Sequence, residues 1–402
     1  MGITTSVNSS EFKNTGLLIL FSLVTRLGYF FVRLSSGEGL PEAYDTEWYL
    51  EHARRILTDF KISLDFNGVF YLGYYTLLSM LLLIFKSQTA IIFIQMVINA
   101  VSVVLVYRIA FLLFKNRRVA FISGLFYTFT MPLIYWSFFI LTDSFFVTLI
   151  LLNVYLLLKF YETKSRKYLL LFITTSLYIL VFRPTGISTL AFIALYIIIN
   201  LDFSKIMRIY RLWVISGLIA IVLVISFVLL KGYLTPLFGS LSRNLEELIW
   251  YHYVPGHIFD ASERFAYKYT ANFSINHFNS FPVSFFINNW NHILVLYLFR
   301  AFLFWAPIVT TPFSLDKLYI VFAFLFGAIG FIYLIRRTDL RKTSIILFVI
   351  FSIWFFCIIF FMDSSFRYRV PALVFLNFIA ALGVDNFLNW SFKGLNNTRR
   401  RF

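Results

Sequence analysis

A cluster of acidic residues directly after the first long apolar segment is the part of this chain best suited to do chemistry. Seven of the 19 carboxylates lie in one short stretch: Glu38, Glu42, Asp45, Glu47, Glu51, Asp59 and Asp65. A carboxylate fixed beside a membrane surface can act as a general base that takes a proton from a substrate. The cluster therefore predicts a general base at the mouth of a cavity within the membrane.

The residues that follow Asp45 predict a helix that lies in the membrane plane. One of its faces is apolar and the other is polar, which is typical of an interfacial amphipathic helix. The apolar stripe is Tyr49, Ala53, Ile56 and Leu57, and the wet face is Glu47, Glu51, Arg54, Arg55 and Thr58. We place Asp45 at the helix N-cap, where backbone amides and the helix dipole favour an ionised carboxylate. His52, further along this helix, is expected to pack or hydrogen-bond.

Other isolated ionisable residues are expected at the same face of the membrane. They lie in short turns between apolar segments, and ionisable groups at that depth are costly to bury and tend to mark a site. Together with Asp45 they come from four separate segments: Asp143, Arg183 just before Pro184, and Arg367 and Arg369 in the turn Arg367-Tyr368-Arg369-Val370-Pro371. Their convergence predicts a single polar site.

The elements that position these residues are membrane-spanning helices. The chain is 60% hydrophobic and 13% charged, whereas soluble domains contain about a quarter charged residues. The net charge of +16 could suggest nucleic acid, but basic residues in a polytopic protein mark cytoplasmic loops. Nucleic acid is therefore not a predicted partner. With Cys357 as the single cysteine, neither an intrachain disulfide nor a cysteine metal cluster can form.

The clustering of basic residues predicts the topology. Five clusters, near residues 115–118, 159–167, 205–211, 336–342 and 393–401, are assigned to the cytoplasm. This assignment leaves about ten spans with both termini cytoplasmic, and it requires residues 71–85 and 288–307 to stay outside without crossing. The spans are 15–34, 88–114, 119–138, 144–160, 168–182, 186–201, 212–230, 318–335, 343–361 and 370–389.

The predicted fold is thus an all-α polytopic membrane protein with in-plane juxtamembrane helices in its external loops. We divide it into a transmembrane module (1–230) that contains the first external loop (35–87), a large external loop (231–317) and C-terminal transmembrane helices (318–402). The compact design, with few long loops, favours the cytoplasmic membrane of a prokaryote, with the site on the external or periplasmic side.

Several short motifs, taken in order, resemble the GT-C superfamily of membrane glycosyltransferases. They are Asp45 in the first external loop with Tyr49 and Ala53, Phe70-Tyr-Leu-Gly73-Tyr74, Lys115-Asn-Arg-Arg118, Leu141-Thr-Asp143-Ser144, Phe182-Arg183-Pro184-Thr-Gly186, and Arg367-Tyr368-Arg369-Val-Pro371. The branch that the chain resembles contains the lipid A 4-amino-arabinose transferases and the protein O-mannosyltransferases. The resemblance covers the N-terminal two thirds best.

The resemblance implies a transferase, inverting in mechanism, that takes a sugar from a polyprenyl-phosphate carrier at the external membrane face. It makes Asp45 the expected base and Asp143 its catalytic partner, which orients the acceptor or supports the site. Relatives often carry Asp-Glu or Glu-x-Asp in the first loop, where this chain has Asp45-Thr46-Glu47. Glu47 is therefore an alternative base, and the need for a divalent metal is left open. The acceptor could be a lipid, a glycan or a protein.

The remaining candidate residues follow from the chemistry of a phosphate-linked donor. Arginine binds phosphate oxygens with two parallel hydrogen bonds and keeps its charge, so Arg183, Arg367 and Arg369, with Tyr368, are the predicted lipid-phosphate site. A negative Asp45 beside the anomeric carbon would also stabilise an oxocarbenium-like transition state. The candidate substrate contacts are His52, Tyr74, Tyr251 and His252.

Two other functions compete with this interpretation. A polysaccharide polymerase or ligase also has many spans, a large external loop and important arginines, but it would not need Asp45. A lipid or solute transporter commonly has Gly- or Pro-broken helices at the bilayer midplane. Here only 17 Gly and 9 Pro are present, and the charged residues gather at one interface, so the transporter is the weaker alternative.

Overall fold

A computed structural model describes residues 9–37, 40–41, 43–60, 62, 66–200, 243, 245–256, 268–305, 314–360 and 367–399. These residues form helices, turns and irregular segments without a β-strand, which confirms the all-α fold class. The helices are α1 (Ser9–Ser35), α2 (Tyr44–Asp59), α3 (Phe66–Phe85), α4 (Gln88–Val101), α5 (Val103–Phe114), α6 (Arg117–Thr128), α7 (Met131–Trp136), α8 (Asp143–Thr163), α9 (Arg166–Leu180), α10 (Thr185–Asn200), the π-helix η1 (Ile249–Tyr253), α13 (Phe281–Asn288), α14 (Trp290–Phe304), α16 (Ser314–Arg337), α17 (Leu340–Phe360) and α18 (Val370–Arg399).

Seven helical segments of the described chain are long and apolar enough to cross a membrane. They are α1, α3, the α4–α5 pair, α8, α16, α17 and α18, and α10 and α14 are shorter apolar helices. The integral membrane class is therefore confirmed, but the sequence-based list of about ten spans differs from these segments in several places. The predicted span 212–230 lies outside the described residues.

The predicted span 119–138 is wrong as a continuous helix. The structure divides it into α6, which ends at Thr128, and the short α7, which begins at Met131. Pro132 is in the first turn of α7 and has no backbone N–H to donate to the preceding turn, so it favours the start of a new helix. After α7 ends at Trp136, residues 137–142 form a turn-rich segment that leads directly into Asp143.

Helix α3 qualifies as a span by its length and composition, although residues 71–85 were predicted to stay outside. Its contacts lie at one end of the bundle. The backbone N–H of Gly73 donates to the carbonyl of Val181 at 2.6 Å, and α3 is followed at once by α4, whose Gln95 hydrogen-bonds to the segment before Asp143. These contacts place the first half of α3 beside the end of α9, and the placement of residues 71–85 outside the membrane stays a prediction.

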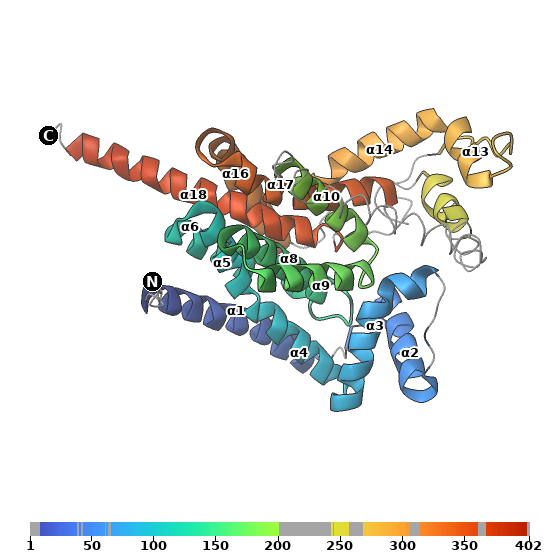
Figure 1. The fold of residues 1–402 in the computed structure, drawn as a ribbon, viewed down its shortest axis with the longest axis horizontal. Helices are drawn as coiled ribbons and strands as arrows, with labels where there is room; N and C mark the ends of the chain where they lie inside the picture. Colours follow the sequence, from blue (N-terminus) through green and yellow to red (C-terminus); the bar gives the residue numbers. More distant parts are fainter. Residues whose placement is uncertain are drawn as a thin grey trace.

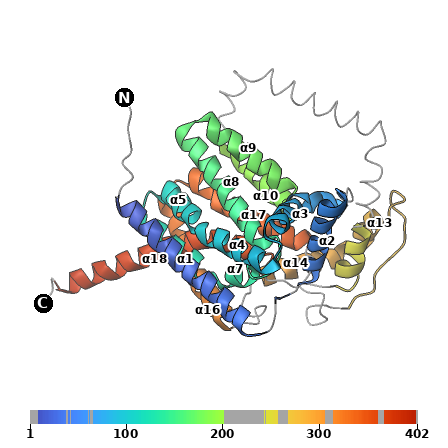
Figure 2. The same ribbon diagram turned by 90° about the horizontal axis from the view of Figure 1, so that it is seen from below.

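The helices bring two of the predicted basic clusters, near residues 115–118 and 159–167, together at one end of the molecule, and the cluster near 205–211 lies outside the described residues. Lys115 and Lys159 both form ion pairs with Glu162, each at 2.8 Å, and Arg118 contacts Asp385 of α18 at 3.5 Å. The beginning of α1 and the C-terminal half of α18 point to that side, whereas α2, α3 and α13 lie at the opposite side (Figure 1). Helices α8 and α9 run side by side between the two ends (Figure 2).

Helices α16 and α18 cross with their backbones in direct contact, at Gly330 and Gly383. A Cβ atom added to Gly383 would lie 1.9 Å from the carbonyl oxygen of Phe326, and one added to Gly330 would lie 1.8 Å from that of Ile379. Small residues permit such close helix approach in membranes, where packing replaces the hydrophobic effect as the main attraction between helices. This contact fixes the direction in which α18 leaves the turn at Arg367–Arg369.

We expect Gly383→Ala to destabilise the protein by about 1–3 kcal/mol, because the methyl group must push two backbones apart. The measurement is thermal unfolding of the purified protein in detergent. Gly28→Ala in α1 is the matched control, since nothing lies within 4 Å of its added Cβ, and alanine gains up to about 1 kcal/mol in a helix. Equal melting temperatures for the two variants would contradict the close packing.

Candidate active site

Helix α2 has the amphipathic character predicted from the sequence. Tyr49 and Ala53 are buried, whereas the residues of the predicted wet face are exposed: Glu47, Glu51, Arg54, Arg55 and Thr58. The predicted N-cap is wrong, because Ala43 occupies that position and Asp45 is the second residue of the helix. Asp45 nevertheless lies in the first turn, where the helix dipole favours a negative charge.

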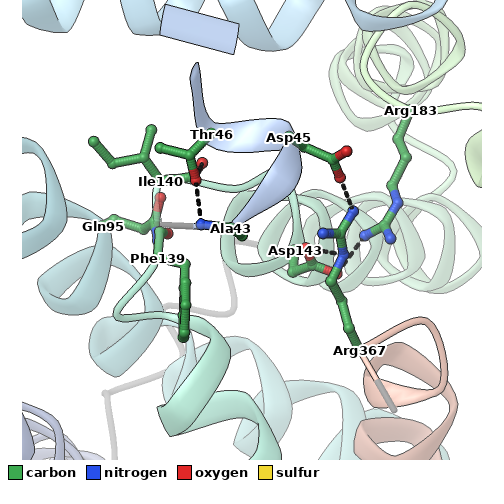
Figure 3. A network of polar contacts seen from close by, with 9 residues as sticks. All are labelled: Ala43, Asp45, Thr46, Gln95, Phe139, Ile140, Asp143, Arg183 and Arg367. Carbon is green, nitrogen blue, oxygen red and sulfur yellow. Dashed lines mark hydrogen bonds and ion pairs between the residues drawn. The ribbon is translucent and has the colours of Figure 1, made fainter. Parts of the chain in front are cut away.

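The structure brings four of the five predicted converging residues together in one chain of ion pairs. Asp45 Oδ2 lies 2.6 Å from Arg367 Nη2, and Arg367 Nε lies 3.2 Å from Asp143 Oδ2. The other oxygen of Asp143 accepts a hydrogen bond from Arg183 Nη1 at 2.6 Å. Charges therefore alternate from Asp45 through Arg367 and Asp143 to Arg183, as Figure 3 shows.

The two carboxylates of this ion-pair chain differ in their exposure. The side chain of Asp45 is 43% exposed, whereas that of Asp143 is fully buried. Asp45 can therefore reach a substrate from the open end of the chain. Asp143 instead neutralises two buried guanidinium groups, which would otherwise be costly in a low-dielectric interior.

Both arginines hold their charge firmly. Burial by itself lowers the pKa of Arg183, but the Asp143 carboxylate more than offsets this effect, and the net shift is upward. The same balance of burial against Asp143 raises the pKa of Arg367 well above its ordinary value, with Tyr368 and Asp45 adding to the upward shift. These guanidinium groups therefore stay protonated at neutral pH.

Tyr368 lies between the two arginines. The guanidinium carbon of Arg183 is 4.6 Å from the centre of its ring and that of Arg367 is 5.2 Å away, within the range of cation–π attraction. Burial raises the pKa of Tyr368, so its hydroxyl stays protonated at neutral pH. The ring thus holds both guanidinium groups in place while leaving their edges available.

Several buried polar atoms around the ion-pair chain have no hydrogen-bond partner among the described residues. These atoms are Nε and Nη2 of Arg183, the hydroxyl of Tyr74, and Oγ1 of Thr142 and of Thr185. Buried polar groups are almost always hydrogen-bonded in native structures, and a group that is not calls for a ligand or an ordered water. The unpaired hydrogen-bonding atoms next to Asp143 and Arg183 are therefore consistent with a binding site for a polar ligand.

Aromatic rings of α2 and α3 pack together beside the site. Tyr49 packs against Tyr71 and Tyr74 with ring centres 5.3 and 4.8 Å apart. His52 stacks on Trp48 at 4.0 Å, and its Nδ1 lies 2.8 Å from the Trp48 carbonyl oxygen. His52 therefore packs and hydrogen-bonds within α2, while Tyr74 lies against Phe182 beside Arg183.

Besides Tyr368, His52 and Tyr74, four predicted site residues have contacts outside the ion-pair chain. Glu47 is 70% exposed and forms an ion pair with Arg54 on the wet face of α2. Arg369 is directed over the ring of Phe304 at 5.6 Å, and burial lowers its pKa to about 10. In η1, Tyr251 is exposed, and His252 is buried with its carbonyl accepting a hydrogen bond from Arg300.

Thr46 and Gln95 were not among the predicted site residues, although both contact the segment between α7 and α8 (Figure 3). Thr46 Oγ1 donates to the carbonyl of Ile140 at 3.4 Å. Gln95 Nε2 donates to the carbonyls of Ser137 at 2.9 Å and Phe139 at 2.7 Å. The available signal was an amide side chain within the apolar run 88–114, where polar groups form bonds between helices.

No group of three or more His, Cys, Asp or Glu residues that could hold a metal ion occurs within the described part of the chain. The two acids of the ion-pair chain are already engaged with arginines.

The fold and the site define an integral, all-helical membrane protein with a chain of alternating charges near one end of its bundle. Residues 71–229 match the family model described as dolichyl-phosphate-mannose-protein mannosyltransferase. This segment is therefore a membrane glycosyltransferase domain of the GT-C superfamily, which confirms the resemblance seen in the sequence. The matched segment contains Tyr74, Asp143 and Arg183. A search of curated proteins finds no match to the chain.

Proposed function

We propose that this glycosyltransferase moves a sugar from a polyprenyl-phosphate-linked donor to a lipid, glycan or protein acceptor at the external face of the membrane. The observation that carries the proposal is the contact of the half-exposed Asp45 with Arg367, which also contacts the buried Asp143. A general base and a phosphate-binding cation thus lie side by side. Transfer of a phosphate-linked sugar requires both.

Asp45 is the proposed general base. Its carboxylate takes the proton from the acceptor hydroxyl or amine as that group attacks the anomeric carbon. The new bond forms on the face opposite the departing phosphate, and the electron pair of the broken carbon–oxygen bond goes to the phosphate. Of the two acids in the ion-pair chain, only Asp45 has a substantially exposed side chain, so it is the one that an acceptor can reach.

Arg183 and Arg367 are the proposed phosphate ligands. Arg183 retains Nε and Nη2 for a ligand, and a phosphate can take two parallel hydrogen bonds from one guanidinium group. A donor phosphate would also compete with Asp45 for Arg367 Nη2. When Arg367 turns to the phosphate, the Asp45 carboxylate is released from its partner and can meet the acceptor. Donor binding would thereby prepare the base.

Asp143 is the proposed partner of this base, acting through the two arginines. It is fully buried and contacts both guanidinium groups, so it fixes their orientation rather than meeting the substrate. The ion-pair chain without a ligand has two acids and two arginines and is close to neutral. An arriving phosphate finds the arginines already desolvated and oriented, which strengthens its electrostatic attraction to them.

The external location rests on the distribution of charge. The basic loops that contact Glu162 and Asp385 lie at one end, and α2 lies at the other (Figure 1). Because basic loops of membrane proteins face the cytoplasm, the end with α2 would face the external or periplasmic side. Both termini would then be cytoplasmic, and the membrane would be the cytoplasmic membrane of a prokaryote.

The test is donor binding by the full-length protein in nanodiscs. The first donor to use is polyprenyl-phosphate-linked mannose, because the matched family is described by a dolichyl-phosphate-mannose donor. We expect Arg183→Gln to weaken donor binding by about tenfold or more, since a hydrogen bond to a charged group contributes roughly 1.5–3 kcal/mol. Arg166→Gln, an exposed arginine at the start of α9, is the matched control and should bind as the wild type does.

Two outcomes would contradict the proposal. One is that the wild type binds neither polyprenyl-phosphate-mannose nor the same carrier with other sugars. The other is that Arg183→Gln binds the donor as tightly as Arg166→Gln does. Either result would direct attention to the polymerase and transporter alternatives.

A further inference from the structure

The segment formed by residues 137–142 connects the two parts of the candidate site. It leads into Asp143, the first residue of α8. Gln95, a fully buried residue of α4, donates from Nε2 to two carbonyls of this segment, those of Ser137 and Phe139. One amide group thus holds the segment at two points just before the buried acid.

Thr46 attaches α2 to the same segment. Its Oγ1 donates to the carbonyl of Ile140 at 3.4 Å and accepts from the backbone N–H of Ala43 at 3.3 Å. These contacts flank Asp45 along the chain. The polar connection therefore runs from Gln95 through residues 137–142 to Thr46 and the first turn of α2, on the side of Asp45 away from Arg367 (Figure 3).

A requirement for packing alone explains Gln95 poorly. Its Oε1 is buried without a hydrogen-bond partner among the described residues, and leaving a polar atom unsatisfied inside a protein is unfavourable. An apolar side chain of similar size would fill the same space without that penalty. The two carbonyl contacts of Nε2 are what an apolar side chain could not supply, so the position of the segment is the feature that requires an amide.

We propose that Gln95 and Thr46 are positioning residues, which together set the separation between Asp45 and the buried Asp143–Arg367 pair. The effect on sugar transfer rests on the proposed function, in which Asp45 must meet the acceptor while Arg367 meets the donor phosphate. Displacement of a catalytic group by about 1 Å can lower the rate by about 10²-fold. Neither residue needs to contact a substrate for its loss to slow the reaction.

The experiment uses near-isosteric replacements in the full-length protein. Gln95→Met and Thr46→Val remove the hydrogen-bond donors and keep the volume. We expect each to lower the turnover number for sugar transfer by about 10- to 10²-fold, with donor affinity unchanged, because the arginines stay in place. Thr46→Ser, which keeps the hydroxyl, should restore turnover.

The control is Asn153→Leu. Asn153 is a buried amide about 15 Å along α8 from Asp143, and its Nδ2 donates to Phe172, Thr175 and Ser176 of α9. The Asn153→Leu variant should lose as much stability as Gln95→Met does while keeping the wild-type turnover per folded molecule. Wild-type turnover in Gln95→Met and Thr46→Val, or an equal loss in Asn153→Leu, would overturn the proposal.

A second measurement separates this inference from the proposed function. Amide hydrogen exchange reports local opening whether or not a sugar is transferred. In Gln95→Met, exchange should become about fivefold to tenfold faster, the equivalent of one lost hydrogen bond, in residues 137–142 and also in the first turns of α2. Unchanged exchange in α2 would disprove the coupling. If the wild type transferred no sugar but Gln95→Met still showed faster exchange in both regions, only the proposed function would be disproved.

Discussion

Replacing Asp45 with asparagine is expected to reduce sugar transfer by about 10²–10⁴-fold, the usual contribution of a positioned general base. The amide has nearly the same shape but cannot accept the acceptor's proton. Arg183, Asp143 and Arg367 remain in contact with one another, so donor binding should persist. The measurement is transfer from the polyprenyl-phosphate donor, with donor affinity determined on the same preparation.

Glu47→Gln is the matched control for Asp45→Asn. Glu47 was the alternative base, but it is highly exposed and forms its ion pair with Arg54 on the opposite, wet face of the same helix. We expect this variant to transfer sugar at close to the wild-type rate. If Glu47→Gln were inactive and Asp45→Asn active, Glu47 would be the base. If both were active, the polysaccharide polymerase or ligase, which does not need this loop, would become the preferred function.

The second large effect is expected on stability, from Asp143→Ala. Within the described residues, this substitution leaves Arg183 without a carboxylate partner. It also removes one of the two carboxylates that contact Arg367 there. Removing one partner of a buried ion pair typically lowers the free energy of unfolding by about 3–5 kcal/mol, because the remaining charge is buried without compensation. Thermal unfolding in detergent measures the change.

A double variant shows whether the uncompensated charge is the cause. Asp143→Leu with Arg183→Met removes the acid and one arginine, and Arg367 keeps Asp45 as its partner. Since a well-packed apolar pair can replace a buried ion pair with little loss, the double variant should recover much of the stability but none of the activity. Glu51→Ala is the control, because Glu51 and its partner Arg55 are both more than half exposed and exposed pairs contribute about 0–1 kcal/mol. A double variant less stable than Asp143→Ala would contradict this explanation.

The amino-acid sequence alone determined the class of protein and the character of its main elements. Apolar runs long enough to cross a bilayer, separated by basic loops, predict a polytopic helical protein regardless of how the helices pack. The amphipathic pattern of α2 is equally local, because the faces of a helix follow from a fixed residue period. Both predictions hold in the structure.

The site itself was predictable only as a list of residues with unusual types and places. The list contained Asp45, Asp143, Arg183 and Arg367, which do converge, because ionisable groups near a membrane interface tend to gather in one polar site. It also contained Glu47 and Arg369, which point elsewhere. Residues two positions apart in the sequence can lie on opposite faces of a helix, and the packing of the helix decides which face meets the site.

Only the tertiary structure decided which charged residues form ion pairs and which polar residues hydrogen-bond to the segment beside them. Asp45 and Arg367 are 322 positions apart in the sequence, and no local pattern links them. Thr46 and Gln95 were missed for the same reason, since their partners are backbone carbonyls of the turn-rich segment between α7 and α8. Periodicity and hydropathy report the surroundings of a single element, whereas ion pairs and hydrogen bonds between elements depend on how helices distant in sequence come into contact.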